Sequence, residues 1–260
     1  MKSKKLWRFY SMEYNIDFIS YNNLKKHVKE TIRTYKNTLK TINLSKFNSN
    51  IVDPIKMTFD SKVYRKSIEQ IISDEIFRQR DKTNSNAIGY FHQNIFAYIY
   101  GCEVPKQYWD IIYHKSDNEK IYVEMKNKHN TMNSSSSQKT YLRMQSEIII
   151  NPMSRCYLVE VIAKTSTDSP WEISLDGQKV SDQRIRRVSI DKFYQMISGD
   201  TLAFKKICDI LPKIIDQVLD ETEDFEIEPD TVIEELKLIY PDILKSIYLL
   251  AFKTYEGFHN

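Results

Sequence analysis

The chain has 260 residues, with a hydrophobic share of 41% and an aromatic share of 12%, so it can bury a sizeable core, and general disorder is excluded. It contains no run of about 18 apolar residues and no apolar stretch near its start, which excludes a membrane span and a secretion signal and leads us to expect a cytoplasmic protein. The net charge is only +3, and the three cysteines are widely spaced outside any CxxC pattern, which argues against disulfides and a zinc site.

The charges are unevenly distributed along the chain. Residues 1–48 contain eleven Lys or Arg against three acids, whereas residues 216–236 contain ten acids and no base. A polyanion could meet the basic part, although ordinary solvated faces are the commoner origin of such runs. We expect one domain over 1–260, composed of a helical arm (1–50), a catalytic core (51–200) and carboxy-terminal helices (201–260).

Apolar residues at helical spacing predict three helices in the first hundred residues. They are expected over 21–43, from a cap at Ser61 to Ile76, and over 88–99. The polar run between the last two, RQRDKTNSN at 78–86, is predicted to be a loop. Gly101 suits the end of the third helix.

Short runs rich in aromatic and β-branched residues predict the strands. They are 108–113, 120–126, 156–163 and 171–175. The first two are joined by HKSDNE, a polar link of hairpin length, so we expect them to pair antiparallel. From about residue 200 the pattern is helical, with a last helix over 241–256. The chain is therefore predicted to be an α/β protein.

The pattern of an acid, any residue and a lysine occurs at Asp60-Ser-Lys62, Glu124-Met-Lys126 and Glu235-Leu-Lys237. With 28% charged residues such matches arise by chance, so the pattern is weak by itself. Only the second match lies in a predicted strand. There the alternation of side chains puts Glu124 and Lys126 on one face, and the hairpin brings Asp110 from the preceding strand beside them.

Two carboxylates and a lysine suit the hydrolysis of a phosphodiester. Carboxylate oxygens bind a hard cation such as Mg²⁺, which polarises the phosphate and stabilises the leaving oxygen. We therefore predict Asp110, Glu124 and Lys126 as catalytic residues, and Asp110, Glu124 and Met125 as metal ligands. The lysine can orient or deprotonate the attacking water. The alternative is a cluster of surface salt bridges without catalytic function.

The helix before the hairpin offers a further polar side chain. Gln93 is predicted to join the catalytic group, because an amide oxygen can orient water or hold a carboxylate. Its neighbour His92 is the weaker candidate, since a hydrogen-bonded histidine in a helix needs no site role.

The run after the lysine, 127–141, is dense in short hydrogen-bonding side chains and is predicted to be a loop that contacts DNA. A flexible linker is the alternative. A basic cluster at 184–187 is a second candidate, for which a solvated strand end is an equally good explanation. The predicted DNA contacts are Lys128, Asn130, Asn133, Ser134, Ser135, Ser136, Gln138, Lys139, Arg143, Arg184, Arg186 and Arg187.

Patterns of other nucleotide-handling proteins are missing from the sequence. None of the five glycines is arranged as GxxxxGK or GxGxxG, which argues against a nucleotide-binding loop. His129-Asn130 is too little for an HNH nuclease. The letters around Tyr98-Ile-Tyr-Gly101 have the wrong spacing for a GIY-YIG nuclease.

Five stretches, in this order, resemble one known family. They are IVDPIKMTFD, RQRDKTNSNAIGYFHQNIF, VEMKNKHNTMNSSSSQKTY, CYLVEVIAK and RIRRVSIDKFY, from about residue 50 to 195. They are similar to the type II restriction endonucleases that cut the interrupted palindrome GGNCC, the Eco-forty-seven-two group of the PD-(D/E)XK superfamily. The family's catalytic pattern falls on Asp110 and on Glu124-Met-Lys126. Trp109 stands where the short form of the motif has proline.

The resemblance implies a PD-(D/E)XK restriction-endonuclease-like fold, in which a mixed central sheet is flanked by helices, with helical additions at both ends. It also implies Mg²⁺ as cofactor, double-stranded DNA as substrate, ends with 5′-phosphates and a homodimer that matches the palindrome. A cognate DNA methyltransferase would be a functional rather than a physical partner. Two alternatives stay open: a structure-specific repair or junction nuclease of the same fold, and a DNA-binding module that does not cleave.

Overall fold

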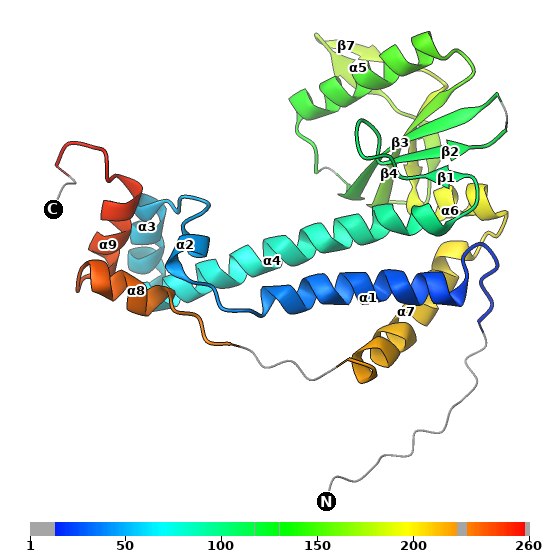
Figure 1. Ribbon diagram of the computed structural model, residues 1–260. Helices are drawn as coiled ribbons and strands as arrows, with labels where there is room; N and C mark the ends of the chain where they lie inside the picture. The colour runs from blue at the N-terminus through cyan, green and yellow to red at the C-terminus, as the bar shows by residue number, and fades with distance from the viewer. Residues whose placement is uncertain (1–13, 117, 130, 223–227, 258–260) are drawn as a thin grey trace, which may run out of the picture. The chain divides into compact units, whose positions relative to one another are not determined.

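The computed structural model describes residues 14–116, 118–129, 131–222 and 228–257 and falls into two compact units. The sheet unit comprises Met1–Glu30 and Gly89–Thr222, and the helical unit comprises Thr31–Ile88 and Glu223–Asn260. The helices α1 (Tyr21–Thr38) and α4 (Ile68–Asn94) have residues in both units (Figure 1). These units do not follow the expected division at residues 50 and 200, and the expectation of one nuclease domain stays a prediction.

The sheet unit is built on a six-stranded mixed sheet with the order β1-β2-β3-β4-β8-β5. Neighbours pair antiparallel along β1, β2 and β3, then parallel from β3 through β4 to β8, and antiparallel again at β5. The bounds are β1 (Cys102–Glu103), β2 (Ile111–His114), β3 (Lys120–Lys128), β4 (Arg155–Ile162), β5 (Asp168–Pro170) and β8 (Ile185–Ser189). The predicted α/β class, with a mixed central sheet flanked by helices, is confirmed.

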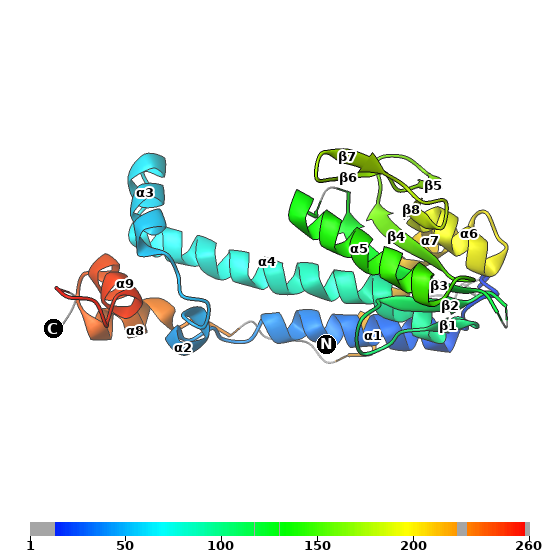
Figure 2. The same ribbon diagram turned by 90° about the horizontal axis from the view of Figure 1, so that it is seen from above.

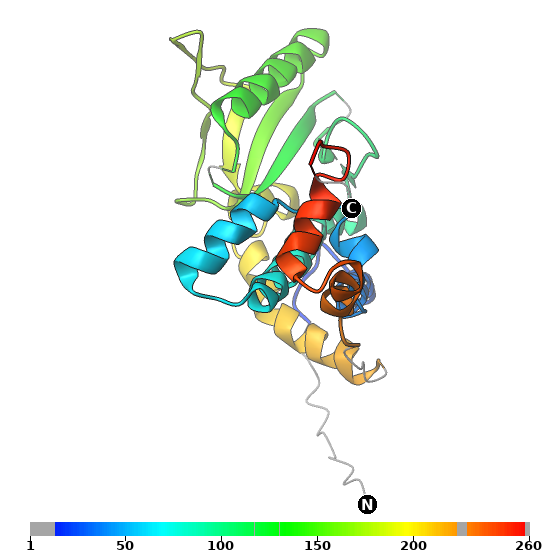
Figure 3. The ribbon, with the colours of Figure 1, turned by 90° about the vertical axis from the view of Figure 1, so that its left-hand side faces the viewer.

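Helices cover both faces of this sheet (Figures 1 and 3). On one face α5 (Ser134–Ile150) buries Tyr141, Met144 and Ile148 in a cluster with Leu158 of β4. The other face is covered by α6 (Ile190–Ser198), followed in the chain by α7 (Ala203–Asp220). Residues in β3 and β4 alternate between these two faces, so each strand contributes to both cores.

A small hairpin accompanies α5. Its strands, β6 (Ile173–Leu175) and β7 (Gln178–Val180), pair antiparallel outside the main sheet. Figure 2 shows the hairpin alongside α5, and Gln138 of that helix donates a 2.8 Å hydrogen bond to the carbonyl of Ser174.

The helical unit has a core of its own. Buried residues from α2 (Leu44–Phe47), α3 (Pro54–Tyr64), α4, α8 (Val232–Ile239) and α9 (Ile243–Ala251) form it. Phe47, Ile72 and Leu236 are among its most buried members. Among the described residues, no helix combines the length and the apolar composition that a bilayer crossing requires.

Several predicted boundaries are wrong in the first hundred residues. The first helix ends at Thr38. Ser61 was predicted to cap a helix but lies within α3. The amino-terminal cap of α3 is Asp53, whose side chain accepts hydrogen bonds from the N–H groups of Ile55 and Lys56. The helix ends at Arg65, which has a φ of 54°. The predicted loop 78–86 lies inside α4 and forms about two and a half of its turns. The run 78–86 contains no Gly or Pro, which would favour a break in the helix. Buried side chains before and after the run anchor α4 on both sides of it.

The predicted loop over 127–141 is also wrong. It continues β3 to Lys128 and then enters α5 at Ser134. Asn133 caps that helix by accepting a 2.8 Å hydrogen bond from the N–H of Ser136. Serine and asparagine favour a helix start as well as a loop, and the helical spacing of Tyr141, Met144 and Ile148 identifies the first alternative.

Candidate active site

Asp110 is the last residue before β2 and lies beside β3. The register pairs Ile111 with Val123, so the next pair along the hairpin is Asp110 with Glu124. The N–H of Asp110 donates to the carbonyl of Val123 at 3.0 Å. Its Oδ2 accepts a 2.7 Å hydrogen bond from the N–H of Met125. The hairpin thus fixes both the backbone and the carboxylate of Asp110 against β3.

Glu124 and Lys126 share one face of β3. Lys126 Nζ lies 2.6 Å from Glu124 Oε1, while Met125 between them is buried on the opposite face. The Glu124 side chain is only 13% exposed. The structure therefore brings together three of the predicted catalytic side chains, Asp110, Glu124 and Lys126.

Arg143 of α5 completes the group, although the sequence predicted it only as a DNA contact. Its Nη2 binds Oε2 of Glu124, and its Nη1 donates to the carbonyl of Tyr108 at 2.9 Å. Its guanidinium lies 4.5 Å from the centre of the Trp109 ring. Trp109, at the position of the motif's proline, is therefore a buried platform for this arginine. Only recognition of α5 as a helix would have placed Arg143 near Glu124.

The negative charge of the Asp110 carboxylate is unfavourable in its present surroundings. Burial, and then the negative charge of Glu124, raise the pKa of Asp110 above its ordinary value. Among the described residues, no group of three His, Cys, Asp or Glu side chains is placed to hold a metal. The carboxylates of Asp110 and Glu124 are side-chain oxygens of the kind that a hard cation prefers.

Gln93 lies close to Asp110, but it contacts the backbone of Asp110 and not its carboxylate. Its Nε2 donates a 3.3 Å hydrogen bond to the carbonyl oxygen of Asp110, so it supports the start of β2. Its neighbour His92 is half-buried and lies edge-on to the Phe91 ring. Burial, and then the nearby His27, lower the pKa of His92 to about 4.

A buried acid next to Lys126 was not predicted. Glu160 of β4 pairs in register with Lys126 and is only 3% exposed. It binds Arg187 of β8 through Oε1 and His129 Nδ1 through Oε2, the latter at 3.0 Å. Burial raises the pKa of Glu160, but the bonds from Arg187 and His129 outweigh it and keep the pKa low. An acid within the apolar run CYLVEVIA was the available signal.

The predicted DNA contacts near β3 lie in one region. Lys128 ends β3 and is exposed, and Lys139 is exposed on α5. Ser134, Ser135 and Ser136 form the first turn of α5, while Gln138 is bound to the β6–β7 hairpin. Asn130 lies outside the described residues.

The three arginines of the 184–187 cluster are not brought together. Arg184 pairs with Asp182 at the amino end of β8, opposite the end of β3 that carries Lys128. Arg186 pairs with Asp168 of β5. Only Arg187 shares the sheet face of Lys126, because Leu158 pairs in register with both Arg187 and Glu124.

Comparison with known proteins identifies the family of the chain. The sequence profile of the Eco47II restriction endonuclease family matches residues 16–220. The type II restriction enzyme Sau96I of Staphylococcus aureus is 29% identical over 209 residues, which cover 77% of this chain and 80% of that protein. The type II restriction enzyme Eco47II of Escherichia coli is 27% identical over 216 residues, which cover 79% of this chain and 89% of that protein. The resemblance seen in the sequence is confirmed: the chain belongs to the Eco47II restriction endonuclease family and is a type II restriction endonuclease, a site-specific deoxyribonuclease.

Proposed function

We propose that this enzyme cleaves both strands of double-stranded DNA at a GGNCC palindrome in a Mg²⁺-dependent reaction that leaves 5′-phosphate ends. The observation that carries the proposal is the meeting of Asp110 and Glu124 across the β2–β3 hairpin, with Lys126 Nζ 2.6 Å from Glu124. This arrangement supports a PD-(D/E)XK active site. The family membership supports a restriction function over repair or inert DNA binding.

The donor set fits a hard divalent cation. Asp110 and Glu124 would hold it together with the carbonyl of Met125, because the N–H and C=O of one strand residue point to the same side. The Met125 N–H already faces the Asp110 carboxylate. When bound, Mg²⁺ polarises the scissile phosphate and stabilises the leaving oxygen.

Lys126 is placed to act on the attacking water. Its ammonium group is held by Glu124 Oε1, and the Lys126 side chain is 30% exposed, so the group can reach a phosphate and a water beside the carboxylates. Arg143 holds the other Glu124 oxygen. The two cations therefore fix the orientation of Glu124 in the absence of other ligands.

DNA contact is assigned to the end of β3 and the start of α5. Exposed Lys128 and Lys139 suit backbone phosphates, and the N–H groups of the first turn of α5 suit anions. We retain the proposal that one arginine among Arg184, Arg186 and Arg187 reads guanine, since arginine binds its two major-groove acceptors. The arginine that reads guanine must then exchange or share the acid that it binds in the free protein.

A palindromic site implies two equivalent active sites, so we propose a homodimer, with each subunit cutting one strand. Sedimentation of the protein, alone and on a duplex in Ca²⁺, would test this. A monomer under both conditions contradicts it. A cognate methyltransferase that protects the same sequence is the proposed functional partner.

Digestion of plasmid DNA tests the proposed reaction. With Mg²⁺ we expect discrete fragments whose 5′ ends can be labelled only after phosphatase treatment. Without Mg²⁺, in EDTA, no cutting is expected. A smear, or cutting that ignores GGNCC sites, would contradict the proposal in favour of a nuclease without sequence choice.

A further inference from the structure

A polar hollow of about 480 Å³ lies within the helical unit, lined from α1, α2, α4 and the segment after α2. Its thirteen lining residues, all within the described part of the chain, comprise four amides, four hydroxyls, four cations and one isoleucine, with no acid. One wall is the polar run 78–86 of α4, where Arg78, Lys82 and Asn86 recur at four-residue spacing on one helix face.

The four cations of this hollow differ in what they bind. Arg78 donates to both oxygens of Glu75, at 2.5 and 2.6 Å. Arg80 binds both oxygens of an acid near α8 and two backbone carbonyls, which ties α1 to α4. Lys46 and Lys82 make no ion pair with the described residues, and both are exposed. The hollow therefore keeps two positive charges among side chains that can donate hydrogen bonds.

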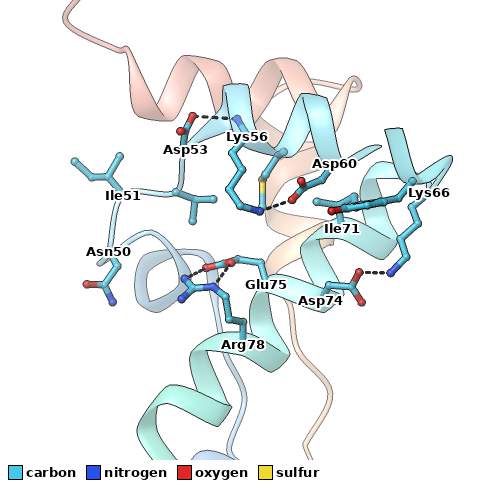
Figure 4. Close-up of a pocket in the computed structure, with 13 residues that line it drawn as sticks. Asn50, Ile51, Asp53, Lys56, Asp60, Lys66, Ile71, Asp74, Glu75 and Arg78 are labelled. Carbon is cyan, nitrogen blue, oxygen red and sulfur yellow. Dashed lines mark hydrogen bonds and ion pairs between the residues drawn. The ribbon is translucent and has the colours of Figure 1, made fainter. Parts of the chain in front are cut away.

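A neighbouring hollow of about 500 Å³ in the same unit is different, because its cations are neutralised (Figure 4). Each lysine or arginine that lines it has an acid of its own. The pairs are Lys56–Asp60, Lys66–Asp74 and Arg78–Glu75. This second hollow has no charge to spare for an anion and provides a matched control.

We propose that the hollow lined by Lys46 and Lys82 binds a phosphate of the DNA backbone. This rests on the proposed function, since it names a second place where the same substrate is held. Amides, hydroxyls and lysines are the side chains that bind DNA phosphates, and such contacts strengthen binding without choosing a sequence. The helical unit thus contributes affinity, and the sheet unit contributes cleavage.

The test compares two double variants that remove the same charge from the same unit. Lys46→Ala with Lys82→Ala removes the proposed phosphate site, and Lys56→Ala with Lys66→Ala removes two lysines of the neutralised hollow. Affinity is measured in Ca²⁺ over a range of salt, on a GGNCC duplex and on an unrelated duplex. We expect the first variant to lose about tenfold on both duplexes and its salt slope to fall by about 1, the value for one phosphate contact, with the control nearly unchanged.

Three results would overturn the proposal. Equal losses in both double variants would mean that only total charge matters, and unchanged affinity in the first variant would mean that the hollow binds no DNA. The third result comes from calorimetry with inorganic phosphate. If phosphate binding depends on Lys46 and Lys82 while the double variant keeps its DNA affinity, the hollow binds a free phosphate and not DNA. Lys46→Arg with Lys82→Arg should restore affinity, and circular dichroism checks each fold. Failure of the unaltered enzyme to cut GGNCC DNA would instead defeat the proposed function.

Discussion

The carboxylate of Asp110 accepts a 2.7 Å hydrogen bond from the backbone N–H of Met125, the residue between Glu124 and Lys126. The position of the first acid is therefore set by the same strand that carries the second acid and the lysine. A shift of one residue in the β2–β3 register would turn Glu124 and Lys126 to the opposite face and separate the group.

Asp110→Asn should lower the cleavage rate by at least about 100-fold while DNA affinity in Ca²⁺ changes little. The amide oxygen can still accept from Met125, so the hairpin is retained, but a charged ligand is lost. Single-turnover cleavage and filter binding measure the two quantities. Asp74→Asn, in the surface pair with Lys66, is the matched control and should cut normally. An active Asp110→Asn variant would exclude Asp110 as a metal ligand.

The same substitution should stabilise the protein near pH 7. Burial, and then the charge of Glu124, raise the pKa of Asp110. The folded protein therefore binds this proton more tightly than the unfolded chain, and this contribution to stability is lost as pH rises through the raised pKa. We expect Asp110→Asn to melt about 2 °C above the unaltered protein at pH 7 without Mg²⁺.

Two further melting curves check that explanation. The difference should disappear near pH 3, where Asp110 is protonated in both states. Added Mg²⁺ should raise the melting temperature of the unaltered protein but not that of Asp110→Asn. A variant that melts lower at pH 7 would contradict the unfavourable charge assigned to Asp110.

Lys126→Ala should reduce the rate of the chemical step by at least about 100-fold, because it removes an ammonium group from beside the scissile phosphate. Arg143 still holds Glu124, so the fold and Mg²⁺ binding should survive. Cleavage is measured from pH 6 to 9, since a lysine that takes part in proton transfer leaves its mark on the pH profile. Unchanged rates across this range would remove Lys126 from the reaction.

The hairpin was predictable because its signals are local. Alternating apolar residues in 120–126, a short polar link and an acid in the preceding run were enough to join Asp110, Glu124 and Lys126. The helix α5 was not recognised, since its serine-rich start reads equally as a loop. The role of Arg143 was lost with it.

The contacts of β4 and β8 with β3 depend on parallel pairing between distant segments, which no local pattern specifies. The pair of Arg187 with Glu160 of β4 was hidden for the same reason. Arg186 binds Asp168 of β5, an antiparallel strand whose position also follows from the tertiary fold. Asp182 lies only two residues before Arg184, so that pair is local.

Glu160→Ala should cost about 1–3 kcal/mol of unfolding free energy, because it removes a buried acid and leaves Arg187, whose side chain is 27% exposed, without its partner. Arg186→Ala should cost less than about 1 kcal/mol, since the Asp168 side chain that it binds is 42% exposed. Urea unfolding at pH 7 measures both. Equal effects of the two substitutions would show that the Glu160–Arg187 pair is not a special support of the strand next to Lys126.

The most direct test uses two short duplexes that differ in one base pair. One contains a single GGNCC site, and in the other the first G·C pair is replaced by A·T. With Mg²⁺, the unaltered enzyme should cut both strands of the first duplex within the site, and Asp110→Asn should cut neither duplex. The second duplex should react at least about 100-fold more slowly, because a wrong base pair costs about 1–3 kcal/mol in binding and more in the transition state. Equal cutting of the two duplexes, or cutting by Asp110→Asn, would contradict the account.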